Sequence, residues 1–64
     1  MLKINGKELD YAGKTISEIL ELEHYQKSQV AVERNEKIIS KTDYDMIRVQ
    51  DNDIIEIVSF VGGG

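Results

Sequence analysis

The stretch LKINGKELDYAGKTISEIL, residues 2–20, decides the fold class. Its first half alternates apolar and polar residues around Asn5-Gly6, a pair that tolerates the positive φ angles of a tight hairpin turn. In its second half, Thr15 and Glu18 have the spacing of a helix capping box, and apolar residues follow at helical spacing. The stretch therefore predicts a β-hairpin and then a short helix that ends between residues 22 and 24.

Three further strands are predicted in the rest of the chain. VAVE (30–33) and the short strand at 38–39 flank a turn over 34–36, and IIEIVSFV (54–61) is the last strand. Asn52 lies in the turn before that strand, where asparagine can adopt the left-handed conformation. A hairpin, one helix and three more strands indicate an α+β fold, with the helix packed on one face of a mixed sheet.

Composition limits the function classes. With 64 residues, the chain is predicted to be one small domain, residues 1–61, followed by a flexible tail, residues 62–64. Eight basic and twelve acidic residues give a net charge of −4, which argues against a nucleic-acid partner and favours a basic patch on another protein. The absence of cysteine fits a cytoplasmic protein, and no apolar run suggests a membrane span or a signal peptide.

The sequence lacks the residues of a self-contained enzyme. His24 is the only histidine and lies near the expected helix end, where a solvated or capping role is ordinary. Asp51 and Asp53 resemble the start of a calcium loop, but the glycine and the later acidic residue of such a loop are missing. No nucleophile motif or phosphate-binding loop is present. We therefore expect no catalytic residue, no metal site and no bound cofactor.

The last strand has more apolar surface than one buried face requires. Glu56 indicates that its own side of the strand faces water, because an unpaired charge is costly to bury. Ile55 and Ile57 then belong to the core. The apolar residues that share the solvated side are Ile54, Val58 and Phe60. Two interpretations remain open: a loop covers these three side chains, or they form a docking patch for a partner.

The three final glycines, Gly62, Gly63 and Gly64, form a tail whose one chemical group is the terminal carboxylate. Glycine has no Cβ, so such a tail can enter a tunnel too narrow for other residues. From Val61 to Gly64 an extended chain spans on the order of 10 Å, enough to reach another protein's active site. A carboxylate is inert toward nucleophiles at neutral pH. Its conversion to a mixed anhydride with AMP makes it reactive, and this needs ATP, Mg²⁺ and a partner enzyme.

The motifs LKINGKEL, TISEIL, VAVERNEKIISKTDY, VQDNDIIEIV and IEIVSFVGGG occur in that order and cover essentially the whole chain. Together they resemble the ThiS family of sulfur carriers in thiamine biosynthesis. The resemblance implies the ubiquitin-like β-grasp fold, which agrees with the element order above. Two departures from the family pattern are DND in place of the usual Asp-Gly-Asp turn, and Gly62 before the terminal diglycine.

The resemblance also implies a cycle in which the chain is a carrier and not an enzyme. A ThiF-like adenylating enzyme would activate the Gly64 carboxylate with ATP and Mg²⁺. Sulfur from a persulfide, held by a cysteine desulfurase or a rhodanese-type donor, would give a thiocarboxylate. A ThiG-like thiazole synthase would then accept the sulfur. We expect a cytoplasmic monomer when the carrier is free, with no membrane or nucleic-acid partner.

Three alternatives stay open at this point. The small subunit of molybdopterin synthase shares the fold, the tail and the thiocarboxylate, although its members tend to be longer. A ubiquitin-like modifier would join Gly64 to a lysine through an amide bond. A plain binding domain would carry the glycine tail incidentally.

Overall fold

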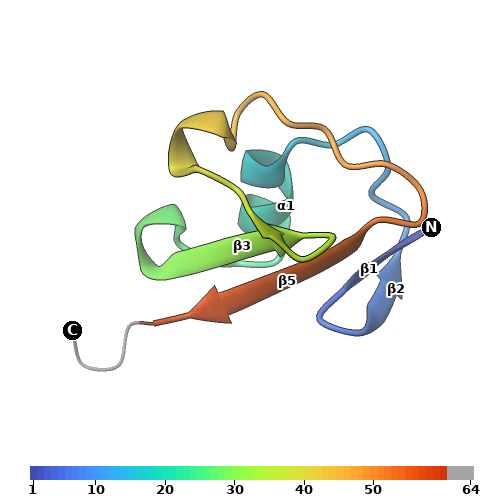
Figure 1. The fold of residues 1–64 in the computed structure, drawn as a ribbon, viewed down its shortest axis with the longest axis horizontal. Coiled ribbons are helices and arrows are strands. Elements are labelled where there is room, and N and C mark those ends of the chain that lie inside the picture. The colour runs from blue at the N-terminus through green and yellow to red at the C-terminus, as the bar shows by residue number, and fades with distance from the viewer. Residues whose placement is uncertain (61–64) are drawn as a thin grey trace.

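A computed structural model describes residues 1–60. The predictions for Val61 and for the tail, residues 62–64, fall outside the described residues. Five strands, one α-helix and two single-turn 3₁₀ helices follow in the order β1 Leu2–Ile4, β2 Lys7–Leu9, α1 Ile16–Leu22, η1 Lys27–Gln29, β3 Val30–Arg34, β4 Lys37–Ile38, η2 Lys41–Asp43 and β5 Ile54–Ser59 (Figure 1).

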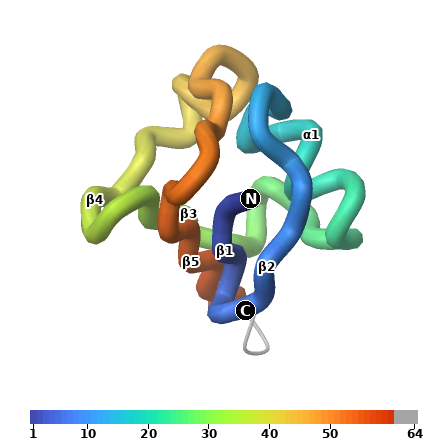
Figure 2. The backbone as a smooth tube through the Cα atoms, turned by 90° about the vertical axis from the view of Figure 1, so that its right-hand side faces the viewer, coloured from blue at the N-terminus to red at the C-terminus, as the bar shows by residue number. Residues whose placement is uncertain are grey.

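The strands form one five-stranded sheet in the order β2-β1-β5-β3-β4. β1 and β5 run parallel, whereas the other neighbours are antiparallel, so the sheet is mixed. β5 lies in the middle, between β1 and β3, as Figures 1 and 2 both show. The helix α1 packs on one face of the sheet, as the sequence predicted.

Both hairpins turn through two residues with positive φ. Asn5 and Gly6 have φ angles of 52° and 84°, which fit the turn type that matches the twist of paired strands. Asn35 and Glu36 repeat the arrangement between β3 and β4, with φ angles of 52° and 72°. The short strand predicted at residues 38–39 lies one residue earlier, because the two-residue turn ends before Lys37.

The last strand ends earlier than predicted. Its antiparallel ladder with β3 closes at the pair Val30 and Ser59, because β3 begins at Val30. The backbone N–H of Phe60 still donates a hydrogen bond to the carbonyl of Gln29, at 3.0 Å. The backbone just after β5 therefore stays hydrogen-bonded to the segment that leads into β3.

The predicted capping box starts α1. The Thr15 hydroxyl accepts a hydrogen bond from the backbone N–H of Glu18 at 3.1 Å, and the Glu18 carboxylate accepts one from the backbone N–H of Thr15 at 2.8 Å. The bond from the Thr15 backbone lowers the pKa of Glu18.

A two-bond reversal ends the same helix. His24, with φ 65°, donates its N–H to the carbonyl of Glu21, and Tyr25 donates its N–H to the carbonyl of Leu20. This pattern satisfies the last helical carbonyls and usually has glycine at the position that His24 occupies. His24 is therefore the residue that caps the C-terminal end of α1.

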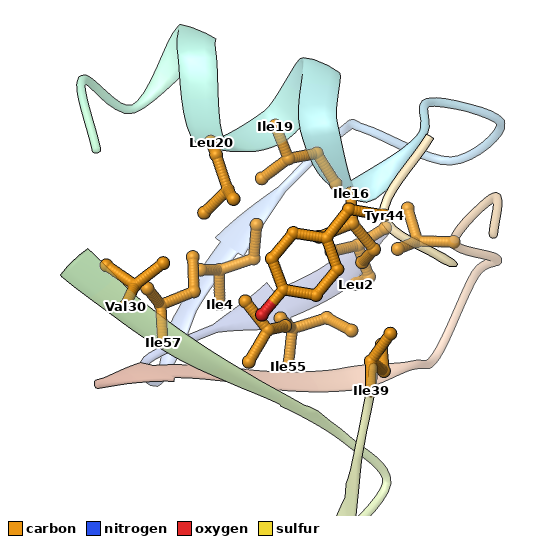
Figure 3. Close-up of a cluster of buried hydrophobic side chains, with 12 residues drawn as sticks. Leu2, Ile4, Ile16, Ile19, Leu20, Val30, Ile39, Tyr44, Ile55 and Ile57 are labelled. Carbon is orange, nitrogen blue, oxygen red and sulfur yellow. The ribbon is translucent and has the colours of Figure 1, made fainter. Parts of the chain in front are cut away.

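The core lies between α1 and the sheet (Figure 3). Tyr44 is its largest side chain and is 1% exposed. Burial raises the pKa of Tyr44, and a hydrogen bond with the Val32 backbone partly offsets that effect. The buried apolar residues are Leu2, Ile4, Ile16, Ile19, Leu20, Val30, Val32, Ile39, Tyr44, Val49, Ile55 and Ile57.

Candidate docking site

The side chains of β5 divide into a buried and an exposed set. Ile55 and Ile57 are 1% and 6% exposed and lie in the core. Ile54, Val58 and Phe60 are 54%, 54% and 56% exposed. The predicted alternation is confirmed, and no loop within residues 1–60 covers the exposed set. The role of that set in docking stays a prediction.

Neighbouring strands extend this exposed surface, which we call the outer face of the sheet. Ala31 on β3 lies directly opposite Val58, and Glu33 lies directly opposite Glu56. Ile38 on β4 lies opposite Glu33 in turn, and it is 76% exposed. Sequence reasoning missed Ile38 because it had no means of aligning β4 with β5 across β3.

A shallow hollow of about 450 Å³ opens on the outer face. Its lining combines one apolar side chain with acidic and amide groups: Glu33, Asn35, Glu36, Ile54 and Glu56. Within residues 1–60, none of these glutamates forms an ion pair, since the three pairs present are Met1–Asp51, Lys27–Asp45 and Arg34–Asp53. The outer face is therefore apolar with an acidic centre.

The asparagines of the two hairpin turns, Asn5 and Asn35, form hydrogen bonds with the backbone of β5. The Asn5 side chain accepts a hydrogen bond from the Ile57 N–H at 2.8 Å and donates one to the Ile57 carbonyl at 3.2 Å. The Asn35 side chain accepts one from the Ile54 N–H at 2.9 Å, and the Asn35 N–H donates to the Ile54 carbonyl at 2.8 Å. Sequence analysis used Asn5 only as a turn residue, because its contact lies 52 residues away.

Phe60 is the last described residue of the outer face. Its ring lies 5.3 Å from the ammonium nitrogen of Lys41, which comes from η2. This contact is within the range of a cation–π interaction and adds little at an exposed site. The ring therefore remains accessible at the point where the chain continues toward Gly62–Gly64.

The two aspartates considered as metal ligands form ion pairs within the fold. Asp51 pairs with the N-terminal ammonium at 2.5 Å, and Asp53 pairs with Arg34 at 2.8 Å. Asn52 has a φ of 72°, which confirms the left-handed turn expected between the two aspartates. Among residues 1–60, no group of three or more His, Cys, Asp or Glu side chains could hold a metal ion. No helix in the same range has the length and apolar character needed to cross a membrane.

The model of the ThiS family matches residues 2–64. The chain belongs to the ThiS family. It is 42% identical to the sulfur carrier protein ThiS of Bacillus subtilis, and the match covers 100% of both chains. A crystal structure of ThiS from Geobacter metallireducens superposes with a TM-score of 0.78 at 34% identity, over 98% of this chain and 97% of that one.

Family membership confirms the resemblance and the ubiquitin-like fold. As a ThiS protein, the chain is a sulfur carrier in thiamine biosynthesis and not an enzyme. A second kind of relative is the thiazole synthase of Paramagnetospirillum magneticum, which is 42% identical over 64 residues. That match covers 98% of this chain but 20% of the synthase, so a ThiS-like segment forms part of that longer protein.

Proposed function

We propose that the carboxylate of Gly64 is the group that carries the sulfur. A ThiF-like adenylating enzyme would join it to AMP with ATP and Mg²⁺, and sulfur from a persulfide would then replace AMP to leave a thiocarboxylate. The donor would be a cysteine desulfurase or a rhodanese-type protein. The observation that supports this proposal is the family match over residues 2–64, which includes the whole glycine tail.

The outer face supplies the binding surface in this proposal. Ile54, Val58 and Phe60 would dock on the adenylating enzyme while Gly62–Gly64 enter its active site. All three side chains are more than half exposed, so they can be buried on binding without any rearrangement of the core. Phe60 directly follows the last residue of β5 and is separated from the tail by one residue, so its docking would also help to position the Gly64 carboxylate.

A ThiG-like thiazole synthase would receive the sulfur. The synthase of Paramagnetospirillum magneticum supports this partnership, since it includes a segment that resembles this chain over 64 residues. Proteins whose domains occur joined in one chain commonly act together. The ThiF-like adenylating enzyme and the sulfur donor are proposed because the resemblance to the ThiS family implies them.

Mass spectrometry of the carrier tests the proposal. The chain, ending at Gly64, is incubated with a ThiF-like enzyme, ATP, Mg²⁺ and a persulfide donor. We expect one oxygen of the last residue to be exchanged for sulfur, with fragment ions that place the change on Gly64. Sulfur at any other residue would contradict the proposal. Stable amide conjugates with lysine side chains would instead indicate a protein modifier.

A further inference from the structure

Two carboxylates of like charge face each other on the outer face. Glu33 and Glu56 are directly opposite in the antiparallel ladder of β3 and β5, and both lie on the side away from the core. Side chains so placed have Cβ atoms about 4.5–5.5 Å apart, and like charges in that position destabilise a sheet. Lys3 on β1 also points outward, but it lies opposite Ile54 and Glu8. The repulsion is therefore not neutralised by an ion pair within residues 1–60.

Along the strands the neighbours of the pair are apolar, while Asn35 and Glu36 of the hairpin turn complete the lining of the hollow. Ile38 lies beside Glu33, and Ile54 and Val58 lie on either side of Glu56 along β5. These three side chains are 76%, 54% and 54% exposed. A partner that covered them would also remove water from the two carboxylates, and a charge interaction strengthens when water is excluded.

We propose that the Glu33–Glu56 pair receives an arginine side chain of the adenylating enzyme, at the centre of the docking face; this inference rests on the proposed function. A guanidinium has five N–H donors in one plane and can bond to two carboxylates at once. It is also less strongly hydrated than the lysine ammonium, which suits a site that becomes covered on binding. The repulsion between the two glutamates would then be relieved only in the complex.

Charge complementarity selects this occupant over the others. A second copy of the chain, docked through the same face about a two-fold axis, would bring four carboxylates together. A nucleic acid would meet an acidic surface on a chain whose net charge is −4. A protein surface with an apolar rim and a central arginine matches both the apolar and the charged part of the outer face.

Three single-charge variants test the proposal. Glu33→Gln and Glu56→Gln each remove one carboxylate of the pair, and the control Glu21→Gln removes an exposed carboxylate of α1, outside the sheet. Urea denaturation of the free protein should show an unchanged or higher midpoint for the two sheet variants. Calorimetric titration with the adenylating enzyme should show a Kd raised roughly tenfold or more for each of them, the size expected when one partner of a covered charge pair is lost. The control should change the Kd by no more than about twofold.

Variants of the enzyme identify the cation. Each arginine on its carrier-binding surface is changed to glutamine, and one of these changes should raise the Kd for the unmodified carrier but not for the double variant Glu33→Gln/Glu56→Gln. The proposal would be overturned by an unchanged Kd for the double variant or by a Kd raised equally by Glu21→Gln. It would also be overturned if the enzyme residue that binds the pair proved to be a lysine and not an arginine. Sulfur transfer to Gly64 of the unmodified chain is measured in parallel. If that transfer occurs while the double variant binds normally, the arginine site is wrong and the proposed function stands.

Discussion

Replacing Asp53 with asparagine should destabilise the domain, because this carboxylate fixes the start of β5. Asp53 is 8% exposed. Its Oδ2 accepts hydrogen bonds from the Arg34 Nε–H at 2.8 Å and from the Gln50 N–H at 2.9 Å, and its Oδ1 accepts one from the Asn35 side chain at 3.0 Å. The bonds to Arg34 and Asn35 tie the segment before β5 to the hairpin of β3 and β4.

The size of the effect follows from these three bonds. A hydrogen bond to a charged group contributes about 1.5–3 kcal/mol, whereas a neutral one contributes about 1 kcal/mol. Asparagine keeps one acceptor oxygen, but its amide nitrogen would face a donor in either orientation of the side chain. We therefore expect Asp53→Asn to lower the free energy of unfolding by about 2–3 kcal/mol at pH 7. In a domain of this size that corresponds to a fall in Tm of roughly 10–20 °C.

The pH dependence gives a second signature. Burial of Asp53 alone would raise its pKa, but the hydrogen bonds from Gln50, Asn35 and Arg34, together with the Arg34 charge, outweigh burial and hold the pKa below 3.8. Because the folded pKa lies below the unfolded one, the stabilisation is fully present above about pH 4 and is lost as the pH falls through the folded value. The difference between wild type and Asp53→Asn should therefore be largest near neutral pH and should narrow in acid.

Urea denaturation followed by circular dichroism, at pH 7 and at several values below pH 4, measures both signatures. Asp51→Asn is the matched control, since the Asp51 carboxylate pairs with the N-terminus and its side chain is 63% exposed. The control substitution should lower the free energy of unfolding far less than Asp53→Asn does. Equal losses for the two variants at pH 7, or a difference that does not change in acid, would refute the argument that Asp53 fixes β5.

Four other substitutions test the core, the docking patch, the tail and the end of α1. Phe60→Ala should raise the Kd for the adenylating enzyme about 30-fold by calorimetry, which is the loss of roughly 2 kcal/mol typical of an aromatic anchor. The same change should barely alter the urea midpoint. Ile57→Ala should lower the free energy of unfolding by about 2–5 kcal/mol, because it opens a core cavity. If Phe60→Ala unfolds the protein as severely as Ile57→Ala does, the patch lies elsewhere. Gly63→Val should abolish adenylation, measured by pyrophosphate release, without a change in the melting curve; a normal rate would rule out a narrow tunnel for the tail. His24→Gly should raise the free energy of unfolding by about 1 kcal/mol, because glycine adopts a positive φ without steric cost, and a loss of stability would contradict the helix end described above.

Locally encoded features could be predicted from the sequence. The Asn5-Gly6 turn, the Thr15 and Glu18 capping box and the two faces of β5 each depend on residues within a few positions of one another, and the structure confirms all three. Turn chemistry, capping and strand alternation act over that range. The resemblance to the ThiS family then supplied the fold name and the function, which alternation and capping alone could not.

Features that depend on strand register were missed. Glu33 and Glu56 are 23 positions apart, and their opposition follows from how β3 aligns with β5. Asn5 reaches Ile57 across 52 positions, so its second role as a fastener of β5 has no local signal. The early end of β5 has the same cause, since it is set by the residue at which β3 begins. A one-residue change in register reverses which side chains share a face, and no short pattern in the sequence fixes it.

The central place of β5 explains how one strand can serve both the fold and docking. β5 is paired with β1 on one side and with β3 on the other, and Asn5 and Asn35 add side-chain hydrogen bonds along it. A slip of β5 would take Ile55 and Ile57 out of the core, so the core also fixes the direction of the side chains on the outer face. A surface that is already ordered loses less conformational entropy on binding. In the proposed cycle, the affinity for a partner would therefore come from the ordered outer face, and the glycines of the tail would provide the reach to a remote active site.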